Sequence, residues 1–227
     1  KMINEMDFQR ATQLYMWGIP MEGLMAWYNH ARNDFNVEEG QLSYYFTRKQ
    51  KQGIITSNLT TPYIISLTNL DKTGPLVLDL PAGRMAGMGL DVHQRVLSDL
   101  GLIGPDKGQG GKYLFVPPGQ EDLSPEGYHV VHLKSNVMLF GVRLLDPNID
   151  KAIEETVPNM STYAYNGGNP SKVMPVVSTP EVEWSSIPAS GMAYWENMHQ
   201  WLQTESIINE RDRFFTAYMK GLGIEKG

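Results

Sequence analysis

Residues 104–119, GPDKGQGGKYLFVPPG, place the strongest local constraint on how this chain can fold. The glycines that crowd its first half let the backbone adopt positive φ angles and approach neighbouring segments closely. Pro117 and Pro118 cannot donate ladder hydrogen bonds, so a strand that follows the glycines must end before them. We therefore predict a structured loop and then a strand over 113–116. We expect a positive φ at Gly110 or Gly111. We also expect that packing against the rest of the protein, and not a bound phosphate, orders the loop.

The same loop does not fit the pattern of a phosphate-binding P-loop. Such a loop needs Ser or Thr directly after its lysine, followed by a helix whose N-terminus faces the phosphate. Here Tyr113 follows Lys112, and strand-forming residues come next. The favoured interpretation is a connection between two strands of a sandwich.

Most of the segment 42–143 has the alternation and turn signals of antiparallel β-structure. Residues 63–67 and 75–81 flank a turn at 71–74, and this pair predicts a hairpin. Residues 91–100 fit either a strand or a short helix. Three further strands are expected, at 113–116, 128–133 and 137–145. Several short strands joined by turns are typical of an antiparallel sandwich.

Apolar residues at helical spacing predict helices at both ends of the chain. At the N-terminus we expect a helix that is capped by Asp7 and broken at Pro20, and a second helix over 21–32.

After a short helix at 150–157, residues 163–188 are rich in Gly, Asn, Ser and Pro and predict a long ordered crossing. Two helices then follow, one at 192–203 with Ser190 as its cap and one at 210–220 that ends at glycines.

Aromatic side chains gather near both ends of the chain. The predicted helices carry Tyr15, Trp17, Trp27 and Tyr28 at one end and Trp195, Trp201, Phe214, Phe215 and Tyr218 at the other. Two short helices cannot enclose so many rings against each other. We predict that the two ends pack together as a helical layer beside the sandwich. Apolar surface left over would meet a C-terminal β module or a second copy of the chain.

Composition excludes several classes of function. The net charge is −6 without a basic cluster, which argues against a nucleic-acid partner. No apolar run approaches the ~20 residues of a membrane span. The chain contains no cysteine, so disulfides, thiolate metal sites and cysteine nucleophiles are excluded together.

Several motifs together are similar to a known family. They are YMWGIP at 15–20, TSNLTTPY at 56–63, GPLVLDLP at 74–81, GPDKG and GGKYL in the glycine loop, and ERDRFF at 210–215. With them the chain resembles, over nearly its whole length, a bacterial family of domains of unknown function, the DUF-1254 type.

The resemblance implies an α+β fold: an antiparallel immunoglobulin-like β-sandwich at 41–165, N-terminal helices in 1–40, and a crossing with a C-terminal helical module in 166–227. A second β module, of the DUF-1214 type, usually follows in that family. Many relatives are exported, which implies a bacterial periplasmic or secreted location. One departure stands out, because Thr60 occupies the place where relatives often carry Asp.

Candidate site residues fall into two sets. The polar residues of the family motifs are candidates for binding a small molecule: Asn58, Thr60, Tyr63, Asp106, Lys107 and Lys112. Asp91, His93 and Asp99 lie within nine residues, and Asp91 and His93 share a face if this segment is a strand. Such ligands suit a divalent metal such as Zn or Mn. The sequence indicates no other cofactor.

Two functions therefore remain open from the sequence. The chain is either a ligand- or partner-binding module of the bacterial cell envelope, or a metal-assisted hydrolase at Asp91, His93 and Asp99. No Gly-x-Ser-x-Gly elbow is present that would indicate a serine hydrolase.

Overall fold

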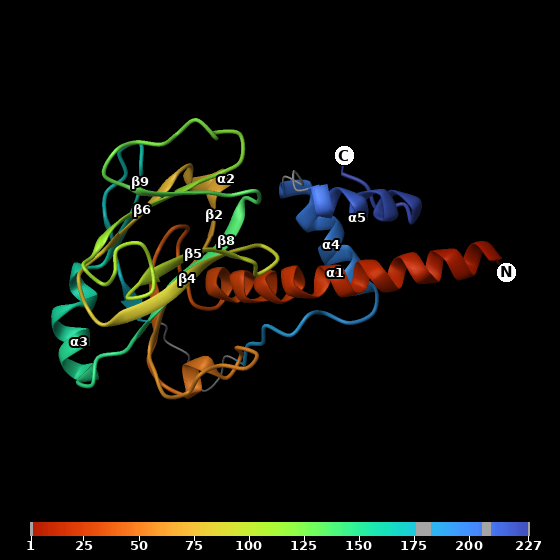
Figure 1. The fold of residues 1–227 in the computed structure, drawn as a ribbon. Coiled ribbons are helices and arrows are strands. Elements are labelled where there is room, and N and C mark those ends of the chain that lie inside the picture. The colour runs from red at the N-terminus through yellow and green to blue at the C-terminus, as the bar shows by residue number, and fades with distance from the viewer. Residues whose placement is uncertain (1, 176–182, 206–209, 227) are drawn as a thin grey trace.

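A computed structural model describes residues 2–175, 183–205 and 210–226. The protein is a mixed α+β structure in which two sheets lie at one end and helices from both chain ends lie at the other (Figure 1). No helix in these ranges is long and apolar enough to cross a membrane. Residues 176–182 of the predicted crossing fall outside the described residues.

The larger sheet has six strands in the order β11-β1-β2-β8-β4-β5. Its strands are β1 (Ser43–Tyr45), β2 (Tyr63–Asn69), β4 (Met85–Asp91), β5 (Val96–Gly101), β8 (Val137–Leu144) and β11 (Met174–Pro175). All of its pairs are antiparallel except β1 with β11.

The smaller sheet has five strands in the order β10-β9-β3-β6-β7. Its strands are β3 (Leu76–Leu80), β6 (Gly111–Val116), β7 (His129–His132), β9 (Ser161–Ala164) and β10 (Ser171–Lys172). The β6–β7 pair is parallel, and the others are antiparallel. The predicted strands at 113–116, 128–133 and 137–145 are confirmed as β6, β7 and β8, and residues 91–100 form the end of β4, a turn and β5.

A hydrophobic core joins the inner faces of the two sheets. Ile64 and Phe140 come from the larger sheet, and Leu78 and Phe115 come from the smaller one. The rings of Phe115 and Phe140 stack with centroids 4.7 Å apart. Because side chains alternate along a strand, the residues between these positions in the larger sheet point to its outer face. That outer face is the one that meets the first helix.

The predicted hairpin of 63–67 with 75–81 is wrong. Strands β2 and β3 belong to different sheets, and the short helix α2 (Leu70–Thr73) carries the chain from one to the other. The Asn69 side chain caps this helix, and Gly74 ends it with a φ of 68°. The same polar and glycine signals serve a tight hairpin and a crossing between sheets, so they could not separate the two.

The glycine loop before β6 has the backbone that its sequence predicts. Gly110 has a φ of 80°, and a Cβ there would lie 2.6 Å from the amide nitrogen of Ala82. Within the loop, the buried Tyr113 hydroxyl donates a hydrogen bond to Asp106. The first of these contacts holds the loop against the end of β3, and the second fixes the loop to β6.

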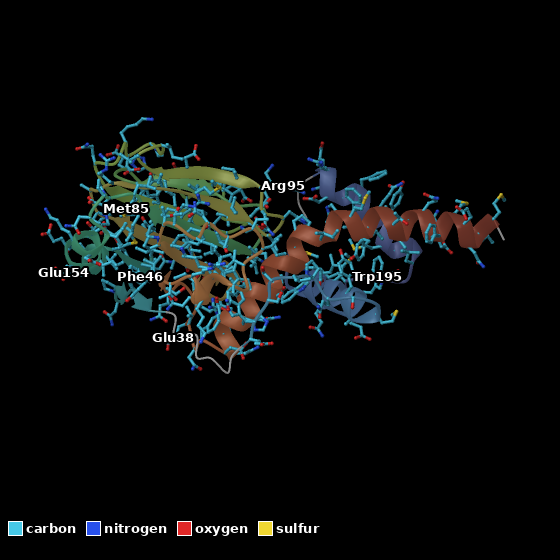
Figure 2. All side chains as sticks on the ribbon, turned by 90° about the horizontal axis from the view of Figure 1, so that it is seen from below. Glu38, Phe46, Met85, Arg95, Glu154 and Trp195 are labelled. Atoms are coloured by element: carbon cyan, nitrogen blue, oxygen red, sulfur yellow. The ribbon has the colours of Figure 1, made fainter. Side chains whose placement is uncertain are left out.

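The first helix, α1 (Met2–Asn33), is continuous, so the predicted break at Pro20 and the predicted cap at Asp7 are wrong. A proline removes one backbone donor, and a helix that is well packed on both sides of the proline absorbs that loss. Leu14 lies before Pro20 and Leu24 after it, and both are buried. The helix changes direction along its length, as expected for one that contains a proline (Figure 2).

The C-terminal part of α1 is fixed to the sheets through Glu39. Burial alone would raise the pKa of this carboxyl, but hydrogen bonds from Arg32, Tyr28 and the Asn69 amide lower it to about 2. Lys72 also donates to Glu39, at 3.0 Å. The carboxylate therefore ties the helix to β2 and α2.

Helices α4 (Met192–Thr204) and α5 (Glu210–Gly221) pack on the N-terminal half of α1, which confirms that the two ends of the chain share a core (Figure 1). The Tyr194 hydroxyl donates to the Tyr15 carbonyl at 2.6 Å. A Cβ on Gly18 would lie 2.3 Å from the Met198 methyl group, so the glycine allows this close approach.

Two details of the predicted helices are wrong. The N-cap of α4 is Gly191 and not Ser190, and it makes no side-chain cap hydrogen bond. The predicted packing of the terminal aromatic side chains does not hold for Phe214, which is 54% exposed because α5 turns its Asp212 and Met219 face toward the rest of the protein. The short helix predicted at 150–157 is confirmed as α3 (Ile149–Glu155), which one 3₁₀ turn follows at Val157–Asn159. Another 3₁₀ turn lies at Lys49–Lys51.

Replacing Gly110 with Ala should destabilise the protein for two reasons. Alanine disfavours the positive φ of this position, and its Cβ would clash with the backbone of residues 80–82. We expect a loss of about 1–2 kcal/mol or more in urea-induced unfolding. Gly119→Ala is the matched control, since Gly119 has a φ of 86° with nothing within 4 Å. A Gly110→Ala variant as stable as the wild type would contradict the packing argument.

The interface of α1 with α4 should give the stability a pH-dependent component. Burial raises the pKa of the Glu22 carboxyl to about 7, and the hydrogen bond from Asn197, at 3.1 Å, offsets this only in part. Because the folded pKa exceeds the unfolded one, this group's contribution is complete below about 4.5 and is lost as the pH rises through 7.

Glu22→Gln removes this titration and keeps the hydrogen-bonding shape. The stability of Glu22→Gln relative to the wild type should therefore rise by at least about 1 kcal/mol between pH 5 and pH 8, measured by urea unfolding at each pH. All other titratable groups are present in both proteins, so the difference between them isolates Glu22. A difference that does not change with pH would be the opposing result.

Candidate functional site

A cavity of about 880 Å³ lies between α1 and the outer face of the larger sheet. Strands β2, β8 and β4 form its floor, α1 forms one wall, and two further segments close the sides. The apolar residues that line it include Ile19, Leu24, Trp27, Ile54, Ile55, Ile65, Met88, Leu90, Ile103, Leu139 and Leu145. The volume lies within the range of small-molecule sites, about 300–1,000 Å³.

The register of the sheet decides which residues form the floor. One row across the strands is Tyr63 on β2, Arg143 on β8 and Ala86 on β4. The next row is Ile65, Gly141 and Met88. Gly141 has no side chain, so the middle of the second row is low. A Cβ there would lie 2.5 Å from the Ile64 carbonyl oxygen, so the strands lie too close for any larger residue.

Helix α1 presents one face to the cavity at four-residue intervals, with Ile19, Gly23 and Trp27. A Cβ on Gly23 would lie 3.0 Å from the Ser186 carbonyl oxygen. The glycine therefore lets the segment at 186–188 close against the helix. Trp27 donates a hydrogen bond to the Tyr45 hydroxyl at 2.8 Å, which fixes its ring.

The loop at 54–57 forms the facing wall, and a buried lysine holds its far side. Lys51 is 1% exposed and donates from Nζ to the carbonyls of Asn58, at 3.1 Å, and Thr61. The Trp184 ring covers Gly53, where a Cβ would lie only 2.2 Å from the ring. Both contacts fix the loop in place before anything binds.

At one end of the cavity, cations gather around an aromatic ring. The Arg143 guanidinium carbon lies 5.1 Å from the centroid of the Tyr63 ring, and the Lys51 Nζ lies 4.6 Å from it. Burial lowers the pKa of Lys51, and the positive charge of Arg143 lowers it further.

At the other end lie His93 and Gln94, on the turn between β4 and β5. The Gln94 side chain donates to the Pro20 carbonyl at 2.8 Å and joins this turn to α1. The His93 ring packs on Trp17 with centroids 4.6 Å apart, and burial lowers its pKa.

A salt bridge behind His93 connects the turn to α5. Arg95 donates to both carboxylate oxygens of Asp212, at 2.6 and 2.8 Å, and Trp17 donates to the same carboxylate at 3.0 Å. Burial raises the pKa of Asp212, but the hydrogen bonds from Arg95 and Trp17, together with nearby positive charge, lower the pKa overall. Arg95 lies where the strands meet the helices (Figure 2).

The proposed metal ligands have other roles in this arrangement. The Asp91 carboxylate accepts hydrogen bonds from the backbone amides of His93 and Arg95, each at 2.9 Å, and so shapes the turn. Asp99 is exposed on β5, in register with Met88. Within residues 2–175, 183–205 and 210–226, no three His, Asp or Glu side chains form a group that could hold a metal ion.

The predicted ligand-binding residues divide between two places. Tyr63 lines the cavity, and Asn58 orders the adjoining turn by accepting hydrogen bonds from the Thr60 amide and hydroxyl, both at 2.8 Å. The others belong to the glycine loop and the smaller sheet: Asp106 accepts from Tyr113, Lys107 has a φ of 51°, and Lys112 pairs with Asp79 at 3.8 Å.

Sequence reasoning missed the contributions of Gly141 and Arg143. A glycine inside an apolar strand is a known sign of close backbone approach, and Gly141 in VMLFGVRL was such a signal. Arg143, two residues further, had to share its face. Their meeting with Tyr63 and Met88 depends on strand register, which the local sequence does not specify.

Comparisons with known proteins support the fold but assign no activity. Residues 40–163 match a family described as a protein of unknown function (DUF1254). No curated protein matches the sequence. Among solved structures, the VPA0106 protein from Vibrio parahaemolyticus is similar with a TM-score of 0.63 and 13% identity, over 97% of this chain and 52% of that one. The chain thus spans about half of that protein's length.

A putative uncharacterized protein from Burkholderia cenocepacia also matches, with a TM-score of 0.36 and 11% identity, over 78% of this chain and 45% of that one.

Lys51→Met should destabilise the protein by about 2 kcal/mol, because two partly buried carbonyls lose a charged donor. The measurement is the midpoint of urea unfolding at neutral pH. Lys49→Met, at an exposed position two residues earlier, makes the same chemical change without these contacts and should leave the midpoint unchanged. Equal midpoints for the two variants would refute the role given to Lys51.

Proposed function

The chain belongs to the DUF1254 family, a family of unknown function, and we propose that it binds an apolar small molecule in the cavity between α1 and the larger sheet. The observation that carries the proposal is this concave, mainly apolar space with a few polar groups at its ends. Pockets of this size and character are the usual form of small-molecule sites.

The rim of the cavity supports this proposal. Five of its lining residues are large apolar side chains that remain exposed to solvent: Ile19, Ile55, Met88, Ile103 and Leu145. Single exposed apolar residues are ordinary, but a group around a concavity indicates a surface that something covers. Met88 on the floor is 38% exposed, whereas its row neighbour Ile65 is 6% exposed. A bound apolar molecule would bury the open part of this floor.

The walls of the cavity are fixed by contacts that need no ligand. Gln94 joins the β4–β5 turn to α1, Lys51 holds the loop wall, and Trp184 packs against Gly53. A preformed site loses little conformational entropy on binding, which favours affinity.

The rest of the family resemblance enters this proposal as well. We infer that the two sheets form an immunoglobulin-like sandwich at 41–165, although β10 and β11 add to its edges beyond that range, and that 1–40 and 166–227 form the helical parts around it. A periplasmic or secreted location would suit a binding module of the cell envelope. Fractionation of cells that express the natural gene tests this, and recovery with the cytoplasmic fraction would refute it.

A partner surface is part of the same interpretation. The exposed apolar side chains on the first half of α1 are Met2, Ile3, Met6, Phe8 and Met16. They would meet a C-terminal β module or a second copy of the chain. Light scattering of this chain distinguishes the two, because a mass of 25.6 kDa would exclude the second copy.

No specific observation favours the metal-assisted hydrolase. The Asp91 carboxylate is engaged by the backbone of its own turn, and the described residues supply no third ligand beside it.

The neutral dye Nile red provides a direct test. We expect saturable binding of one dye per chain, with an affinity at least about tenfold lower in Ala86→Trp, because an indole at that floor position fills the cavity. Ala193→Trp is the matched control on the exposed surface of α4 and should bind as the wild type does. Thermal unfolding checks that both variants fold. Absence of saturable binding, or equal binding by both variants, would overturn the proposal.

A further inference from the structure

Arg143 is a charged side chain without a charged partner. It projects from β8 between Tyr63 and Ala86, at the rim of the cavity. Across the described residues, it makes no salt bridge within 4.0 Å and no side-chain hydrogen bond, and its guanidinium lies over the Tyr63 ring. A guanidinium carries five N–H donors in a fixed planar fork, so this end of the cavity presents unused donors.

The surroundings add a second positive charge and no negative one. Lys51 lies over the same Tyr63 ring, close enough for Arg143 to perturb it electrostatically. The described lining of the cavity contains no Asp or Glu. A chain with a net charge of −6 thus keeps a locally positive site at one end of this apolar cavity. An anionic group placed there is attracted by both cations.

The opposite end of the cavity differs in charge. His93 is partly buried there, and this burial lowers its pKa. The neighbouring charges, Asp91, Arg95 and Asp212, pair with one another. From Ala86, beside Arg143, to Asp91 the strand β4 rises by five residues, roughly 17 Å at about 3.3 Å each. Between these ends the lining is apolar.

We propose that the ligand is an amphipathic anion: one extended apolar chain that lies along β4 and β8 and ends in a carboxylate bound by Arg143. This inference rests on the proposed binding function and names the class of ligand. The geometry of a carboxylate matches the guanidinium fork, and the pair can form two parallel hydrogen bonds. The Tyr63 ring stacks against Arg143 and limits the orientations that the guanidinium takes, while the apolar row of Ile65 and Met88 receives the chain.

Displacement of Nile red by dodecanoate and by its methyl ester tests the proposal. The two probes share the same chain, and only the acid carries a charge. For the wild type, dodecanoate should displace the dye at a concentration at least about tenfold lower than the ester does. In Arg143→Gln the acid should weaken to the level of the ester, while the ester itself is unchanged. Arg213→Gln, which makes the same change on the exposed surface of α5, should keep the preference.

The outcomes distinguish a failure of the anionic-ligand proposal from a failure of the binding function. Nile red that binds in the cavity but is displaced equally by acid and ester, or by neither, overturns the anionic ligand and leaves the binding function standing. A loss of both acid and ester binding in Arg143→Gln assigns the arginine a structural role and also overturns the proposal. Absence of Nile red binding to the wild type overturns both.

Discussion

The packing of α1 against two different partners is the interaction on which the rest of the structure depends. An isolated helix is marginal in water, so a helix of this length is stable only through the surfaces that it buries. Its second half buries Leu24, Trp27 and Tyr28 against the larger sheet, and its first half packs on α4 and α5. Glu39 anchors the end nearest the sheets, and the Trp17–Asp212–Arg95 group anchors the middle. The helical layer and the sheets are therefore joined by one continuous element, which contains a proline near its middle.

The cavity is a consequence of how that helix crosses the larger sheet. The sheet needs cover on both faces, because its strands carry apolar residues on both sides, and β2 is buried along its whole length. The smaller sheet packs on the inner face, together with α3 and the 3₁₀ turn that follows it. On the outer face α1 covers β2, where Tyr63 and Ile65 are buried, but β8 and β4 are only partly covered. An apolar sheet face that a single helix cannot span leaves a concavity, and here it contains Gly141 at its lowest point.

The sequence predicted which helices and strands form better than it predicted which of them pair or pack together. Strands and helices follow local periodicity, and the positive φ of Gly110 follows from local chemistry, so both could be predicted. The continuity of α1 through Pro20 could not, because burial on both sides of the proline outweighs its lost hydrogen bond. The hairpin failed for a related reason, since turn residues do not specify which sheet the next strand joins. Of the cavity residues, Tyr63 and His93 were identified because they are polar or aromatic, whereas Gly141 acquires its role only from its register opposite Ile65 and Met88.

Charge pairing explains why the conspicuous polar residues are not the informative ones. The sequence suggests Asp91 as a metal ligand. In the structure Asp91 pairs with Arg95, Arg95 pairs with Asp212, and these ion pairs hold the turn to α5. The Glu39 carboxylate likewise forms salt bridges with Arg32 and Lys72. Groups that a fold uses for its own stability have no unused capacity for a ligand. The side chain that keeps its capacity is Arg143, which a strand pattern marks only as an outward polar position. Arg143 is exposed at the rim of an apolar cavity, so its guanidinium can accept a counter-charge that arrives with the ligand.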